Sequence, residues 1–176
     1  MVKAITLLKY NRLTRLGYWF AEKLKLTADA NPMIREADIL VPVPLHSARR
    51  RERGYNQTEL IARPSARLLK IPTDAGLLMR IKPRPPQLFL SRRERWLSVR
   101  GAYEIRRGRR IDNLRVLLID DVFTTGATLD ACARALKKGG AKSVTGLTIA
   151  RALWRGSPPA ERLRQTNSDR KRENSI

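Results

Sequence analysis

Two adjacent acids, Asp120 and Asp121, stand two residues before a short segment that is rich in threonine. Carboxylates accept hydrogen bonds from a vicinal diol or help to hold a hydrated Mg²⁺, but they repel a phosphate. In the segment that follows, Gly126 lets the backbone approach a ligand, while amides and hydroxyls donate to phosphate oxygens. The two features together predict a site for ribose 5-phosphate. The residues of the predicted phosphate loop are Thr124, Thr125, Gly126, Ala127 and Thr128.

The residues around this site predict the elements that position it. Val116 to Ile119 is an apolar run, typical of a buried parallel strand. Apolar residues between 129 and 136 recur at helical spacing, the glycines at 139 and 140 end the helix, and Val144 to Ala150 form the next strand. The pattern predicts a right-handed βαβ unit with the acids beyond the carboxyl end of its first strand, where open α/β sheets bind ligands.

The remaining chain supplies weaker signals for further elements. Roughly the first 25 residues show helical spacing of apolar residues, and Asp38 to Pro44 reads as a short buried strand followed by a basic loop, Arg49 to Arg53. Val99 to Ile105 is a candidate strand. A second helix contains Pro64, which lacks an N–H and should clash with a carbonyl one turn earlier, so we expect a kink or a break there.

A length of 176 residues suits one α/β domain with a mainly parallel central sheet flanked by helices. We assign this domain to residues 1–153. From about Trp154 the apolar pattern disappears, so residues 154–176 are predicted to be a basic, disordered tail. No apolar run approaches the roughly 18 residues of a membrane-spanning helix, which predicts a soluble, cytoplasmic protein with no membrane insertion.

The composition excludes some kinds of site and favours polyanionic partners. A single cysteine and a single histidine exclude an internal disulfide and argue against a zinc site. Cys132 falls on the apolar face of its helix, so a buried thiol is expected. The formal net charge of +21 predicts attraction to nucleic acid, pyrophosphate or a phosphorylated sugar, and charge alone does not choose among them.

The stretch from Val116 to Thr128 resembles the phosphoribosyl pyrophosphate fingerprint of type I phosphoribosyltransferases. It has four apolar residues, two acids and a Thr-Thr-Gly-x-Thr loop. The resemblance implies that Asp120 and Asp121 face the ribose hydroxyls and, with Mg²⁺ as cofactor, the metal. It also implies that Thr124 to Thr128 wrap the 5-phosphate.

Two further stretches, Pro42 to His46 and Arg53 to Gln57, resemble the ComF/GntX family, and the likeness extends over about Leu8 to Arg151. ComF-like chains often begin with a cysteine-rich zinc-binding segment, which this sequence lacks, so we expect a short form or a truncated gene product. Ser98 stands where the family usually has asparagine.

Arginines near the predicted site have two interpretations. Arg49 and Arg53 are expected to meet the leaving pyrophosphate, as part of the catalytic set with Asp120 and Asp121, or to belong to a solvated basic loop. A second cluster at positions 92, 93 and 95 is a candidate flap over the site, or a nucleic-acid contact beside Trp96. His46 is expected to be an ordinary loop residue.

Three functions remain open from the sequence. The first is Mg²⁺-dependent phosphoribosyl transfer from phosphoribosyl pyrophosphate to a nitrogenous acceptor. The second, implied by the ComF resemblance, is a non-catalytic accessory protein for DNA uptake that binds single-stranded DNA and DNA-uptake proteins. The third is a sensor that binds phosphoribosyl pyrophosphate without turnover. The acceptor and the oligomeric state are left open.

Overall fold

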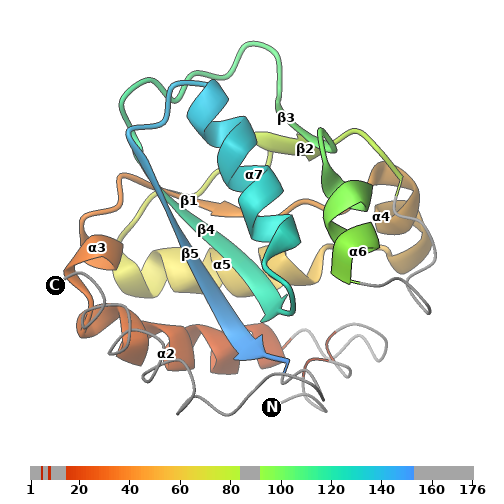
Figure 1. The fold of residues 1–176 in the computed structure, drawn as a ribbon. Coiled ribbons are helices and arrows are strands. Elements are labelled where there is room, and N and C mark those ends of the chain that lie inside the picture. The colour runs from red at the N-terminus through yellow and green to blue at the C-terminus, as the bar shows by residue number, and fades with distance from the viewer. Residues whose placement is uncertain (1–4, 6–7, 9–14, 84–91, 153–176) are drawn as a thin grey trace, which may run out of the picture.

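A computed structural model describes residues 15–83 and 92–152, together with Ile5 and Leu8. Its centre is a parallel sheet in which β4 (Arg115–Phe123) lies between β1 (Ile39–Pro42) and β5 (Ser143–Arg151) (Figure 1). The other elements are α2 (Leu16–Asp29), α3 (Pro32–Arg35), α4 (Ser47–Arg53), α5 (Gln57–Leu69), β2 (Leu78–Arg80), α6 (Arg92–Val99), β3 (Tyr103–Ile105) and α7 (Ala127–Lys138). The expected α/β architecture with a parallel central sheet is confirmed.

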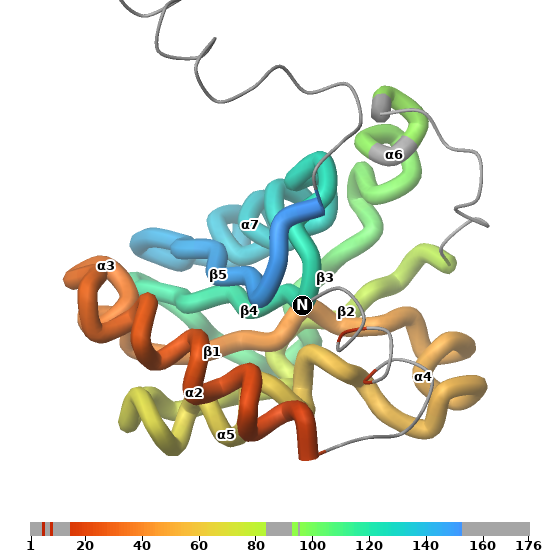
Figure 2. The backbone as a smooth tube through the Cα atoms, turned by 90° about the horizontal axis from the view of Figure 1, so that it is seen from below, coloured from red at the N-terminus to blue at the C-terminus, as the bar shows by residue number. Residues whose placement is uncertain are grey.

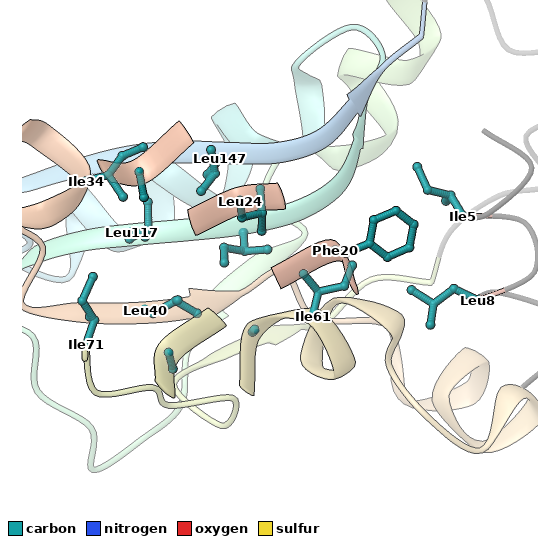
Figure 3. Packing of buried hydrophobic residues seen from close by; sticks show 14 residues of the cluster. Ile5, Leu8, Phe20, Leu24, Ile34, Leu40, Ile61, Ile71, Leu117 and Leu147 are labelled. Carbon is teal, nitrogen blue, oxygen red and sulfur yellow. The ribbon is translucent and has the colours of Figure 1, made fainter. Parts of the chain in front are cut away.

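Helices cover both faces of this sheet, with α2 and α5 on one side and α7 on the other (Figure 2). Side chains of β4 alternate between the two layers, because successive residues of a strand point to opposite faces. Leu117 and Ile119 pack with α2 and α5 around Phe20, as Figure 3 shows for the labelled part of this cluster. Val116 and Leu118 pack on the side of α7. Burial on both faces explains why the strand is a continuous apolar run.

The predicted βαβ unit is confirmed as β4, α7 and β5. Its first strand is longer than the apolar run indicated, because pairing with β5 continues to Phe123. Both Asp120 and Asp121 therefore lie within the last residues of the strand and not in a loop after it. The helix ends at Lys138 with Gly139 as its C-cap, as the glycine pair predicted.

The basic segment Arg49 to Arg53 was expected to be a loop, and this is wrong: it belongs to α4. His46 begins the helix, with Nδ1 accepting a hydrogen bond from the Ala48 amide at 3.3 Å. Gly54 ends it at φ +82°, donating its amide to the Arg50 carbonyl at 2.8 Å. Arginine is a good helix former, and the contacts at these two ends satisfy backbone groups that a helix of seven residues leaves unpaired.

Pro64 does not break α5, which runs without interruption from Gln57 to Leu69. The carbonyl of Leu60, which has no amide partner one turn later, faces Gly17 of α2. A Cβ atom at Gly17 would lie only 2.3 Å from that oxygen, so the two helices approach closely only because residue 17 is glycine. Tertiary packing against α2 and the sheet therefore maintains a helix that the local sequence alone does not favour.

A second, two-stranded sheet pairs β2 with β3 in antiparallel register. The candidate strand Val99 to Ile105 is partly wrong, since Val99 ends α6 and only Tyr103–Ile105 is strand. Between them the chain turns at Gly101, whose φ is +60°. An isolated bridge between His46 and Arg80 joins β2 to the segment that follows β1.

No helix in the part of the chain that the structure describes is long and apolar enough to cross a membrane. The predicted tail, 154–176, lies outside the described residues, as do residues 9–14 of the first predicted helix. Of the candidate flap, Arg92, Arg93 and Arg95 lie in α6, and residues 84–91 before it are outside the description.

Asp38 and Arg115 join the start of β1 to the start of β4 through an ion pair at 2.8 Å and two backbone contacts. Hydrogen bonds from Arg115 lower the pKa of Asp38 from 3.8 to about 2. A carboxylate whose pKa is lowered by folding stabilises the folded protein. For Asp38 the stabilisation is fully present above the pKa of the unfolded state, near 3.9, and is lost as pH falls through the folded-state pKa of about 2.

We therefore predict that Asp38→Asn lowers the free energy of unfolding at neutral pH, and that the difference from wild type shrinks between about pH 4 and pH 2. Urea unfolding of both proteins across that range measures it. A difference that stays constant with pH would show that the ion pair does not stabilise the strand pairing.

Candidate functional site

The two acids lie at the end of β4 but face opposite sides of the sheet. Asp121 is buried on the side of α5, where the Gln57 Nε2 donates to its Oδ2 at 3.0 Å. Asp120 is half-buried on the side of α7, where its charge acts on the Cys132 thiol. The alternation of side chains along a strand thus assigns each acid to a different helical layer.

Asp120 is held at the strand end, since its Oδ1 accepts a hydrogen bond from the Asp121 amide at 2.9 Å. Cys132 lies behind it, fully buried as predicted from the helical spacing. Burial raises the pKa of the Cys132 thiol well above its usual value, and the charge of Asp120 raises it further. This thiol is therefore a packing group and not a nucleophile.

The predicted phosphate loop turns from β4 into α7, with the helix beginning at Ala127. Gly126 adopts φ +79° and lies against the Phe123 ring, which a Cβ atom at residue 126 would approach to 3.1 Å. The Ala127 amide lies 3.4 Å from Thr125 Oγ1. Within the described ranges, the amides of Thr124, Thr125 and Gly126 donate to no protein acceptor. The loop therefore presents backbone donors, together with exposed and half-exposed hydroxyls of its threonines.

The arginines of α4 follow the carboxyl end of β1, which is the same sheet edge as the end of β4 because the two strands are parallel. Arg53 is half-buried and donates from Nη1 to the Gln57 Oε1 at 2.6 Å. Arg49 is exposed and lies 3.8 Å from Glu52. The structure thus connects Arg53 to Asp121 through Gln57, whereas the contact of Arg49 is with Glu52 of its own helix.

Two polar residues at this edge were not assigned a role from the sequence. Gln57 belongs to a motif that carries the family resemblance, but nothing in its position along the chain indicates its contact with Asp121. Arg80 is 91% buried in β2, where Nη1 donates to the Tyr103 hydroxyl at 2.9 Å. Its Nη2 has no hydrogen-bond partner among the described residues. No sequence signal distinguishes this arginine from the many others.

The site offers few metal ligands of its own. Across residues 15–83 and 92–152, no three His, Cys, Asp or Glu side chains gather in a group that holds a metal ion. Asp120 and Asp121 are the two carboxylates at the end of β4. Mg²⁺ keeps several waters and is commonly bound by one or two carboxylates plus substrate phosphates, so this donor set fits Mg²⁺ delivered with a phosphorylated ligand.

A cavity of about 710 Å³ lies beside this site, between α6, β3 and α7. Neither Asp120 nor Asp121 lines it. Its walls include the rings of Trp96 and Tyr103, apolar groups of α7, and a rim with both positive and negative charges. The charged residues of the rim are Arg100, Glu104, Asp130, Arg134 and Lys138.

A parallel sheet with helices on both faces, and a βαβ unit that carries two acids and a threonine loop at its carboxyl edge, define a type I phosphoribosyltransferase fold. Comparison with known proteins agrees, since residues 30–169 match the phosphoribosyl transferase domain. The chain belongs to the phosphoribosyl transferase domain family, and within it to the ComF group.

Similar proteins include competence protein F of Haemophilus influenzae, 32% identical over 80% of this chain and 60% of that protein. The DNA utilization protein YhgH of Salmonella typhimurium is 30% identical over 83% of this chain and 65% of its own length. Competence protein ComFC of Bacillus subtilis is 36% identical over 65% of this chain and 45% of that protein. The chain thus spans about half to two thirds of these relatives.

We predict that Gly126→Ala lowers the free energy of unfolding by about 1–2 kcal/mol or more, because a left-handed backbone disfavours a side chain and the new Cβ meets the Phe123 ring. Gly54→Ala is the matched control, since residue 54 has a similar φ of +82° but open space around a Cβ. Urea unfolding should show the larger loss for Gly126→Ala. Equal losses would mean that Phe123 does not constrain the loop.

Proposed function

We propose that the chain binds phosphoribosyl pyrophosphate together with Mg²⁺ and transfers its phosphoribosyl group to a nitrogenous acceptor in the cytoplasm. The observation that carries this proposal is the junction of β4 and α7. Two carboxylates stand there two residues before a loop whose amides at 124, 125 and 126 have no protein acceptor in the described ranges. Membership of the phosphoribosyl transferase domain family supports the same assignment.

Each part of the site has a task in such a reaction. The amides and hydroxyls of Thr124 to Thr128 donate to the 5-phosphate, while the Asp120 carboxylate accepts from the ribose hydroxyls. The arginines of α4, Arg49 and Arg53, lie at the same edge, and the exposed Arg49 neutralises the departing pyrophosphate. The bond between the ribose carbon and pyrophosphate breaks, a bond to the acceptor nitrogen forms, and that nitrogen loses a proton.

Asp120 and Asp121 are the residues that would hold Mg²⁺, which when bound neutralises charge on the phosphates. Because the two acids face different layers, we assign the more accessible Asp120 to direct contact with the sugar and its metal. Asp121 is buried and borders α5.

We predict that calorimetry detects phosphoribosyl pyrophosphate binding only with Mg²⁺ present, and that Asp120→Asn weakens it by about tenfold or more, because a hydrogen bond to a charged group contributes roughly 1.5–3 kcal/mol. Asp112→Asn, which removes an exposed acid paired with Arg110, is the control and should bind as the wild type does.

The absence of Mg²⁺-dependent binding, or an unchanged affinity in Asp120→Asn, would contradict the proposed site. Pyrophosphate release across a panel of nitrogenous bases then separates the enzyme from a sensor. A sensor binds the ligand and releases no pyrophosphate with any base.

A second candidate function is binding of single-stranded DNA, and the cavity beside α6 favours it. Trp96 is 37% exposed on its wall, close to the cations of the rim. Proteins that bind single strands combine an aromatic surface on which bases stack with cations that contact phosphates. Relatives named as competence and DNA utilization proteins support a role in DNA uptake, in which DNA-uptake proteins are the partners.

We predict that Trp96→Ala weakens single-stranded DNA binding by roughly fivefold or more, since stacking of one base contributes about 1–3 kcal/mol. Trp19→Ala is the matched control, because Trp19 is 40% exposed on α2, across the sheet from α6 and α7 (Figure 2). Filter binding at two salt concentrations should also show weaker binding at high salt. Equal effects of the two tryptophan changes would place DNA elsewhere.

A further inference from the structure

A chain of hydrogen bonds connects helix α4 to the acid at the end of β4. The Arg53 Nη1 donates to the Gln57 Oε1 at 2.6 Å, and the Gln57 Nε2 donates to the Asp121 Oδ2 at 3.0 Å. Gln57 and Asp121 are both buried, at 6% and 5% exposure, although they are 64 positions apart in the sequence. Buried polar groups of this kind are expensive unless they are hydrogen-bonded, so the contacts fix one arrangement.

Only one orientation of the Gln57 carboxamide satisfies both neighbours. A guanidinium only donates, so it requires the amide oxygen, and an ionised carboxylate only accepts, so it requires the amide nitrogen. Arg53 therefore orients the carboxamide, and the carboxamide in turn presents its N–H to Asp121.

The backbone that carries Gln57 is itself attached to the carboxyl end of β1. Its two neighbours both donate to the Val43 carbonyl, Asn56 from Nδ2 at 3.1 Å and Thr58 from Oγ1 at 2.6 Å. Asn56 also caps α5 by accepting from the Thr58 amide. Gln57 thus projects from a point that is fixed relative to the sheet.

We propose that Gln57 is a positioning residue for Asp121, and that Arg53 acts on the site through Gln57 and not by direct contact with the ligand. The inference rests on the proposed function of the site. The inference gives the two α4 arginines different roles. Arg49 is exposed and available to a pyrophosphate, whereas an Nη atom of Arg53 donates to the Gln57 carboxamide. Asp121 then contributes to the site through the orientation in which Gln57 holds its carboxylate.

The first test needs no ligand and measures the coupling between Gln57 and Asp121. Gln57→Glu keeps the size and the acceptor for Arg53 but removes the donor toward Asp121, and Asp121→Asn alone is a second variant. The double variant restores a hydrogen bond with donor and acceptor exchanged. Each single change should lower Tm by roughly 3–8 °C, and the double variant should recover most of the summed loss.

The second test measures Mg²⁺-dependent phosphoribosyl pyrophosphate affinity by calorimetry. Gln57→Glu should lower it by about tenfold or more. Ile61→Val is the control, since Ile61 is fully buried on the same helix but packs only in the apolar core around Phe20. It should lower Tm and leave affinity within about twofold, a difference that a merely structural role of Gln57 would not produce.

A third variant set tests the part of Arg53. Arg53→Met should weaken affinity in the wild-type background and have no further effect in Gln57→Leu. Additive losses of Tm in the first test, or an undiminished effect of Arg53→Met in Gln57→Leu, would overturn the inference. If the wild type does not bind phosphoribosyl pyrophosphate at all, the proposed function fails, while the Tm cycle still decides whether Gln57 holds Asp121.

Discussion

The structure depends on the burial of β4 on both faces up to the point where it becomes polar. From Val116 to Ile119 the strand supplies one apolar side chain after another to the two helical layers. The next two residues continue the same alternation, so Asp121 enters the layer of α5 and Asp120 enters that of α7. Strand geometry alone therefore gives two neighbouring carboxylates different surroundings.

The elements around β4 bring cations and backbone donors to the same edge. Since β1 runs parallel to β4, helix α4 begins where the acids lie, and α7 begins directly after them. The N-terminal end of α5 is attached to β1 through Asn56 and Thr58. Close packing of α2 on α5 at Gly17 keeps that helix against the sheet in spite of Pro64. A packing contact of α2 at Leu60, about one helical turn from Gln57, thus contributes to the position of Gln57.

The βαβ unit could be predicted from the sequence because its signals are local: an apolar run, a helical repeat and two glycines. Helix α4 could not, because seven residues are too few for a periodic pattern and its limits depend on His46 and Gly54. Continuity through Pro64 depends on packing with α2, which propensity does not describe. The sequence showed the acids and the loop as neighbours along the chain. It could not show the hydrogen bonds of Gln57 with Asp121 and of Arg80 with Tyr103, because these partners are 64 and 23 positions apart.

The account is tested most directly by a crystal structure of the protein with Mg²⁺ and phosphoribosyl pyrophosphate. It should show the 5-phosphate against the amides of residues 124–126, and the ribose hydroxyls at Asp120. It should also show Asp121 still bonded to Gln57. A ligand bound away from the junction of β4 and α7, or no ligand at saturating concentration, would contradict the account.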